Sequence, residues 1–147
     1  MSEAHESETL EFLFAQVCKL KHARVQTLLE AIGLYRGQPP VLRALWAQDG
    51  LTHTDLARTL EVQPATITKM INRMEKNGFV QRRQDADDQR VWRVYVTEAG
   101  RAVQEDVRQV WRMLEQEAFE GFTMEERVLL RRFFLQIREN LVRASGD

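Results

Sequence analysis

Hydrophobic residues recur at helical spacing along most of this 147-residue chain. From about Thr9 to Ile32 the apolar positions mostly repeat every three or four residues, which predicts an amphipathic helix that ends at Gly33. Proline is well tolerated in a first helical turn, so a second helix is predicted from about Pro40 to just before Gly50. Its predicted buried face consists of Val41, Leu42, Leu45 and Trp46.

Two shorter predicted helices follow, separated by a tight turn. Thr52 and Asp55 have the spacing of a capping box with Asp in place of Glu, which predicts a helix over about His53–Leu60. The next helix is predicted from Pro64 to about Asn77. Its apolar positions are spaced i, i+3, i+4 and i+7, and they are Ile67, Met70, Ile71 and Met74.

The hydrophobic period then changes from that of a helix to that of a strand. Phe79–Arg83 and Val91–Val96 are predicted strands, and the polar, acidic segment Gln84–Arg90 is predicted to join them as a hairpin loop. Two more helices are predicted, one over about Glu98–Phe119 and one opened by a capping box of Thr123 with Glu126. The expected fold is mainly α-helical with a small β-hairpin.

Charge and composition narrow the class of protein. The net charge of −1 gives no support for a nucleic-acid partner, but Thr52 to Val96 contains eight basic and six acidic residues, a local net charge of +2. No apolar run is long enough to span a bilayer, and the N-terminal segment lacks the basic region of a signal peptide. With Cys18 as the single cysteine, no internal disulfide can form. We therefore expect a cytoplasmic protein without a membrane partner.

The order helix, turn, helix, hairpin over residues 39–97 predicts a winged helix-turn-helix domain. The major groove of DNA admits one α-helix, and the helix that begins at Pro64 leaves small and cationic side chains exposed for bases and phosphates. The alternative interpretation of this face is an ordinary solvated helix surface. The candidate DNA-binding residues on this helix are Ala65, Thr66, Thr68, Lys69, Asn72 and Arg73, with Lys76 also exposed.

The hairpin adds further candidate DNA-binding residues. Its arms carry Arg82, Arg83 and Arg93, and its tip carries Arg90, which could enter a narrow minor groove. Asp88 precedes Arg90 by two residues and could orient the guanidinium through a bidentate pair. The alternative is a surface ion pair of little energetic consequence. The position directly after a candidate recognition helix favours the DNA-binding role.

Asp55 to Gly100 resembles the core of the MarR family of bacterial transcriptional regulators. The resemblance rests on a combination of short motifs: Leu56-Ala57, Thr66 to Met74, Gly78-Phe79-Val80, Arg82-Arg83, Asp88-Gln89-Arg90, and Val96-Thr97 followed by Gly100. Phe79 and Val96 stand where the family more commonly has Leu, and both keep the position apolar. The flanking helices match the family's layout, so the resemblance extends over nearly the whole chain.

The resemblance implies a homodimer on double-stranded DNA with a pseudopalindromic operator. Residues 9–33 and 98–143 would form the N- and C-terminal dimerisation helices, an assignment that their long apolar stripes also favour. The resemblance places Thr66, Thr68, Lys69 and Arg73 against DNA, and it makes Arg90 the wing arginine held by Asp88. We expect a repressor whose affinity for DNA falls when a small-molecule effector binds. The near-neutral charge leaves a protein-interaction module without DNA binding as the alternative.

We expect no catalytic site, no metal site and no cofactor. His5, His22 and His53 are scattered without metal-ligand spacing, and no phosphate-binding glycine loop or nucleophile elbow is present. Cys18 is interpreted as a buried structural thiol rather than a peroxide sensor, because it adjoins Val17 in a helix expected at the dimer interface. The aromatic residues are expected in the core or the dimer interface, and they include Trp46, Trp92, Trp111, Phe12, Phe14, Phe133 and Phe134.

Overall fold

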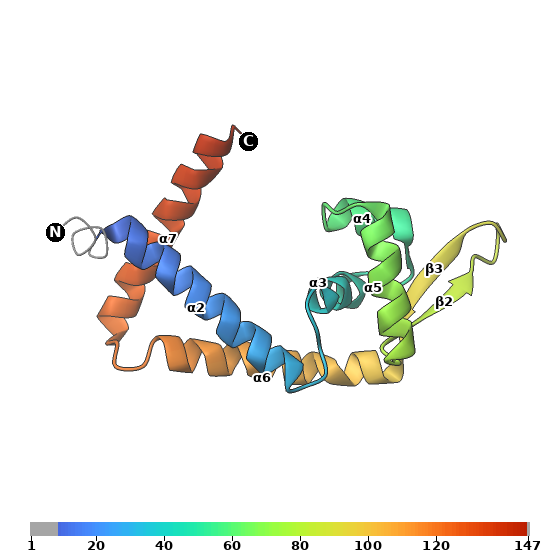
Figure 1. Ribbon diagram of the computed structural model, residues 1–147, viewed down its shortest axis with the longest axis horizontal. Helices are drawn as coiled ribbons and strands as arrows, with labels where there is room; N and C mark the ends of the chain where they lie inside the picture. The colour runs from blue at the N-terminus through green and yellow to red at the C-terminus, as the bar shows by residue number, and fades with distance from the viewer. Residues whose placement is uncertain (1–8, 147) are drawn as a thin grey trace. The chain divides into compact units, whose positions relative to one another are not determined.

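The computed structural model describes residues 9–146. Its helices and strands follow the predicted order, with one short strand added (Figure 1). The helices are α2 (Leu10–Glu30), α3 (Gln38–Ala47), α4 (His53–Thr59), α5 (Pro64–Lys76), α6 (Glu98–Ala118) and α7 (Met124–Ser145); the strands are β1 (Leu51–Thr52), β2 (Val80–Gln84) and β3 (Trp92–Val96). Among the described helices, none is both long and apolar enough to cross a membrane.

The chain divides into two compact units that meet within α6, the first ending at Trp111 and the second beginning at Arg112. The first unit contains the hydrophobic core, which α3, α4, α5 and the two hairpin strands share with Leu29 of α2 and with Val103, Val107 and Val110 of α6. Its fully buried large side chains are Leu34, Val41, Leu42, Leu45, Leu56, Ile67, Ile71, Met74, Val80 and Val94. α5 contributes three of these side chains. Their packing in the core fixes the direction in which the opposite, exposed face of α5 points.

The predicted helix starts are confirmed at the level of individual hydrogen bonds. Thr52 Oγ1 accepts a hydrogen bond from the Asp55 backbone N–H at 3.1 Å, and an Asp55 carboxylate oxygen accepts one from the Thr52 N–H at 3.2 Å. Thr123 and Glu126 form the same reciprocal pair at the start of α7. Both boxes satisfy backbone donors that a helix start otherwise leaves without a partner.

A third strand pairs with the hairpin to form a small sheet, and the hydrophobic pattern did not predict it. β1 has only two residues, too few to show an alternating pattern, and it pairs antiparallel with β3 at Leu51 and Val94. β2 pairs with the other side of β3, in a register that runs from Val80 opposite Val96 to Gln84 opposite Trp92. The strand order β1-β3-β2 therefore joins the hairpin to the start of α4.

Gly100 allows the first turn of α6 to approach the chain just before β2. A Cβ atom at this position would lie 2.2 Å from the Phe79 carbonyl oxygen and 2.7 Å from a methyl group of Val96. The Gly100 carbonyl also accepts a hydrogen bond from the Trp46 indole N–H at 3.0 Å. The close contact is with backbone, so a side chain here cannot be accommodated by a rotamer change.

We expect Gly100→Ala to lower the free energy of unfolding by about 1–3 kcal/mol, the usual cost of overpacking. Chemical denaturation measures this change. Ala99→Leu is the matched control, because it adds more volume on the exposed side of the same turn and is expected to change stability by only about 0.5 kcal/mol. Wild-type stability of Gly100→Ala would contradict the packing described here.

Candidate nucleic-acid interface

The exposed face of α5 carries all the candidate residues predicted for it. Ala65, Thr66, Thr68, Lys69, Asn72 and Arg73 are exposed, as is Lys76. On the opposite face Ile67, Ile71 and Met74 are buried, as the apolar spacing predicted. Within residues 9–146, no ion pair engages Lys69, Arg73 or Lys76. These three cations are therefore available to an external anion.

At the tip of the hairpin, Asp88 holds Arg90 as predicted. Arg90 Nε and Nη2 donate to the two Asp88 carboxylate oxygens at 3.1 and 3.3 Å, and the Arg90 backbone N–H donates to Oδ1 at 3.0 Å. The hydrogen bonds from Arg90 lower the pKa of Asp88, so the carboxylate stays charged at neutral pH. Because 91% of the Arg90 side chain is exposed, the pair contributes little to stability and mainly fixes the direction of the guanidinium.

A second carboxylate, Asp85, organises the loop from inside. It accepts hydrogen bonds from the backbone N–H groups of Asp87 and Asp88 at 2.8 and 3.1 Å, and from Arg93 Nε at 2.6 Å. The Arg93 hydrogen bond is the main cause that lowers the pKa of Asp85 to about 2. Arg93 also donates to the Gly50 carbonyl at 3.0 Å, which ties the hairpin to the turn before β1.

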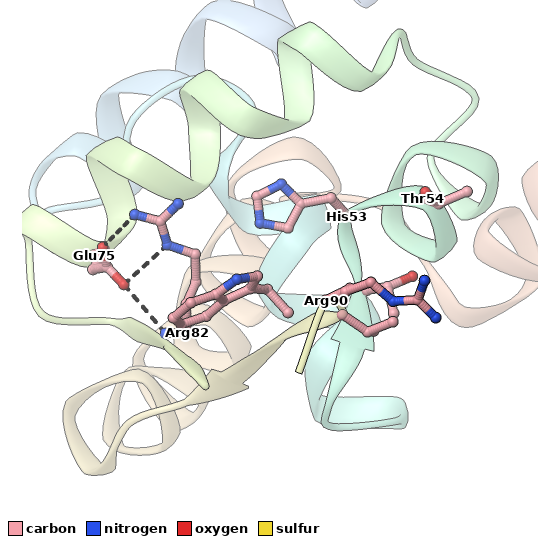
Figure 2. A pocket seen from close by; sticks show the side chains of 8 residues that line it. His53, Thr54, Glu75, Arg82 and Arg90 are labelled. Carbon is pink, nitrogen blue, oxygen red and sulfur yellow. Dashed lines mark hydrogen bonds and ion pairs between the residues drawn. The ribbon is translucent and has the colours of Figure 1, made fainter. Parts of the chain in front are cut away.

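The two arginines of β2 make contacts within the protein. Arg82 donates to both Glu75 carboxylate oxygens, at 2.9 and 3.3 Å from its side chain and at 3.2 Å from its backbone N–H (Figure 2). These bonds lower the pKa of Glu75 and connect β2 to α5. The Arg83 guanidinium lies 5.1 Å from the centre of the Tyr95 ring. That Arg82 and Arg83 also contact DNA stays a prediction.

An open hollow of about 810 Å³ lies between the start of α4, the end of α5 and the hairpin (Figure 2). It is lined by Thr52, His53, Thr54, Glu75, Arg82, Arg90, Val91 and Trp92. Sequence reasoning did not assign His53, Thr54 or Trp92 to this surface. Trp92 is expected in the core or the dimer interface, but 48% of it is exposed. It shares the face of β3 with the buried Val94 and Val96, but it lies at the loop end of the hairpin, opposite Gln84, beyond the core.

His53 connects α4 to α5 at this hollow. Its Nδ1 lies 3.3 Å from Thr68 Oγ1. Burial is the main cause that lowers the pKa of His53, and the Arg82 guanidinium lowers it further, whereas Glu75 raises it. Helix spacing alone gives no signal for this contact, since it depends on how the two helices pack.

The apolar faces of α2 and α7 are exposed in the single chain. Cys18, which was expected to be buried, is exposed, and its neighbours Val17 and Leu20 are 57% and 64% exposed. Cys18 is therefore not buried within one chain, and its burial at a dimer interface stays a prediction. None of the α7 residues is buried either. Burial of both faces requires a second surface.

The residues that the structure describes contain no cluster of His, Cys, Asp and Glu that could hold a metal ion. His5 lies outside the described residues.

A family model described as the MarR family matches residues 34–92. The HTH-type transcriptional regulator YwoH of Bacillus subtilis is 32% identical over 124 residues, which cover 82% of this chain and 90% of that protein. The chain belongs to the MarR family.

Solved MarR-family structures share its winged helix-turn-helix fold. Wild-type MarR of E. coli in its apo form superimposes with a TM-score of 0.74 at 25% identity, over 88% of this chain and 96% of that one. A mutant of S. aureus MepR bound to an oligodeoxyribonucleotide superimposes with a TM-score of 0.70 at 24% identity, over 90% and 98% of the two chains. This MarR-family protein is a DNA-binding transcriptional regulator and not an enzyme.

Proposed function

We propose that this protein is a homodimeric repressor that acts in the cytoplasm, binds a pseudopalindromic double-stranded operator and releases it when an effector binds. Residues 39–97 form the DNA-binding domain, and residues 9–33 and 98–143 form the dimerisation helices. α5 enters the major groove and the hairpin reaches the adjacent minor groove. A two-fold protein matches half-sites of two-fold DNA about one helical turn apart.

One observation carries the DNA-binding proposal: a helix face with cations that pair with no residue of the described chain lies beside a wing arginine already oriented by a carboxylate. Lys69 and Arg73 are four residues apart and share one stripe of α5. The acidic residues nearby bind groups of the protein itself, as Glu75 binds Arg82 and Asp85 binds Arg93. The charges that stay without an ion pair on the exposed face of α5 are therefore positive.

Lys69→Ala and Arg73→Ala are expected to weaken operator binding without unfolding the protein. A residue that contacts a guanine should lose about 1–3 kcal/mol and relax the preference at that base, whereas a phosphate contact should reduce the salt slope by about one. Titration of an operator selected from a random duplex library measures both effects. Arg108→Ala, which removes the same charge from the exposed surface of α6, is the control. Salt-independent binding, or an equal loss in the control, would count against the proposal.

A cavity of about 240 Å³ in the first unit is proposed as the effector site. Its lining is mostly apolar but includes two arginines, and the Arg43 guanidinium lies 5.9 Å from the centre of the Trp111 ring. The lining residues come from α2, the segment 31–37, α3 and α6, and they are His22, Val25, Gln26, Leu29, Leu34, Tyr35, Arg36, Gly37, Pro39, Pro40, Arg43 and Trp111. These features suit a flat apolar molecule that carries an acidic group.

The effector proposal predicts that an aromatic carboxylate releases the operator. Benzoate should weaken operator binding by the wild type, whereas benzyl alcohol, which has the same ring without the charge, should have less effect. Arg43→Ala should need a higher benzoate concentration for the same release, and Arg108→Ala should behave as the wild type. An effector acts only through different affinities for the two states of the protein, so equal release by both compounds would exclude recognition of the charge.

A further inference from the structure

We propose that His53 is a positioning residue: it holds the Thr68 hydroxyl oxygen in place, and Thr68, whose hydrogen is bonded to Pro64, then offers DNA only a hydrogen-bond acceptor. His53 is the first residue of α4, and Thr68 is the fifth residue of α5. The inference deepens the proposed function and rests on it, because it requires the exposed face of α5 to lie against DNA. Its consequence is a base preference at one operator position.

The direction of each hydrogen bond follows from the atoms present. A hydroxyl group has one hydrogen to donate and two lone pairs to accept with. Thr68 Oγ1 lies 3.1 Å from the Pro64 carbonyl oxygen, which can only accept, so the hydroxyl hydrogen is used there. Towards His53 Nδ1 at 3.3 Å, Thr68 Oγ1 must then accept, and Nδ1 carries the hydrogen.

The surroundings of the second ring nitrogen, Nε2, also favour the tautomer with the hydrogen on Nδ1. Nε2 of His53 is buried and has no hydrogen-bond partner among the described residues. A proton on Nε2 would find no acceptor there, and the nearby Arg82 guanidinium opposes a second positive charge more than Glu75 favours one. The ring is therefore neutral at neutral pH and has a single hydrogen, on Nδ1.

Thr68 is left with one lone pair for DNA. It cannot donate to a phosphate oxygen, to the N7 or O6 acceptors of guanine, or to the O4 acceptor of thymine without giving up its bond to Pro64. It can accept from an exocyclic amino group, which adenine and cytosine both present in the major groove. We therefore expect the base that faces Thr68 to be adenine or cytosine.

The experiment compares operator duplexes with and without that amino group. The wild type is first used to select its operator from a random duplex library. Each adenine of one half-site is then replaced by purine, which lacks the amino group, and each cytosine by 2-pyrimidinone, which lacks it too. At one position the wild type should bind the analogue about five- to tenfold more weakly, as expected for one neutral hydrogen bond. The base replaced there tells adenine from cytosine.

Variants then assign that discrimination to the two residues. Thr68→Val keeps the shape of the side chain and removes the hydroxyl, so it should bind both duplexes equally. His53→Asn places an amide N–H where Nδ1 lies and should retain the discrimination, whereas His53→Leu, which has no donor, should lose it. The ratio of the two affinities within one variant does not depend on the fraction of protein that is folded.

Different failures have different meanings. Equal discrimination by His53→Asn and His53→Leu would overturn the role of His53, as would a wild type that tolerates the loss of every amino group while still selecting a defined operator. If His53→Leu does not fold, His53→Ala, which also removes the donor, takes its place in the comparison with His53→Asn. A wild type that selects no operator at all would overturn the proposed function itself, and this inference with it.

Discussion

Replacing Arg90 by Ala is expected to weaken operator binding by about ten- to a hundredfold, the range of a charge-assisted hydrogen bond, and to leave the melting temperature unchanged. The reason for the first effect is that Arg90 is held ready for the minor groove by three hydrogen bonds to Asp88. The reason for the second is that the side chain is 91% exposed. Operator titration and thermal unfolding of the same preparation measure the two quantities.

Asp88→Ala separates orientation from simple electrostatics. Removing a negative charge near DNA should tighten binding if charge alone matters, but it should weaken binding if Asp88 preorganises Arg90. We expect weaker binding, and no further loss in the double variant with Arg90→Ala. Asp87→Ala is the matched control, because it removes the same charge from an exposed neighbour. Tighter binding by Asp88→Ala than by the wild type at equal salt would show that the orientation mechanism is wrong.

Phe133→Asp is expected to dissociate the homodimer and to weaken operator binding by about a hundredfold or more, since two linked half-site contacts gain that much over one. Phe133 is 49% exposed within a stripe of apolar α7 side chains that the single chain leaves uncovered. The other exposed members of this stripe are Leu129, Phe134, Ile137 and Leu141. An exposed stripe of this kind marks an interaction surface.

Sedimentation at micromolar concentration measures the first of these effects, and operator titration measures the second. Gln136→Asp is the control, because it places the same charge on a polar, exposed position of the same helix. A monomeric wild type, or a Phe133→Asp variant that still sediments as a dimer, would contradict the dimerisation assigned to α7.

Features that depend on neighbouring residues could be predicted from the sequence. The Thr52 and Thr123 capping boxes and the amphipathic face of α5 follow from spacing within one helix, and all are confirmed. The pair of Asp88 and Arg90 is equally local, since two residues in a tight loop have few other orientations. These contacts follow from local geometry and do not depend on how the helices and strands pack together.

Features that depend on packing between elements could not be predicted. Arg82 finds Glu75 across a helix end and a turn, Arg93 bridges Asp85 to Gly50, and His53 meets Thr68 only because α4 packs on α5. The polar, acidic segment Gln84–Arg90 is predicted only as a hairpin loop, whereas Asp85 anchors that loop with its side chain 16% exposed. Cys18 shows the converse limit, because an apolar helix face does not reveal whether its cover comes from the same chain.

The short strand β1 helps to join α4, α5 and the hairpin into one DNA-binding part. The hairpin is fastened to α5 through Arg82 and Glu75, and to the start of α4 through β1 and the bond from Arg93 to Gly50. The base of the wing is therefore tied to both helices of the helix-turn-helix, which favours movement of the wing together with α5. The proposed effector then acts on two quantities, the separation and the tilt of the two winged domains of the dimer. The rotational position of one half-site relative to the other then decides binding. Half a helical turn of DNA added between the half-sites would rotate one winged domain away from its groove.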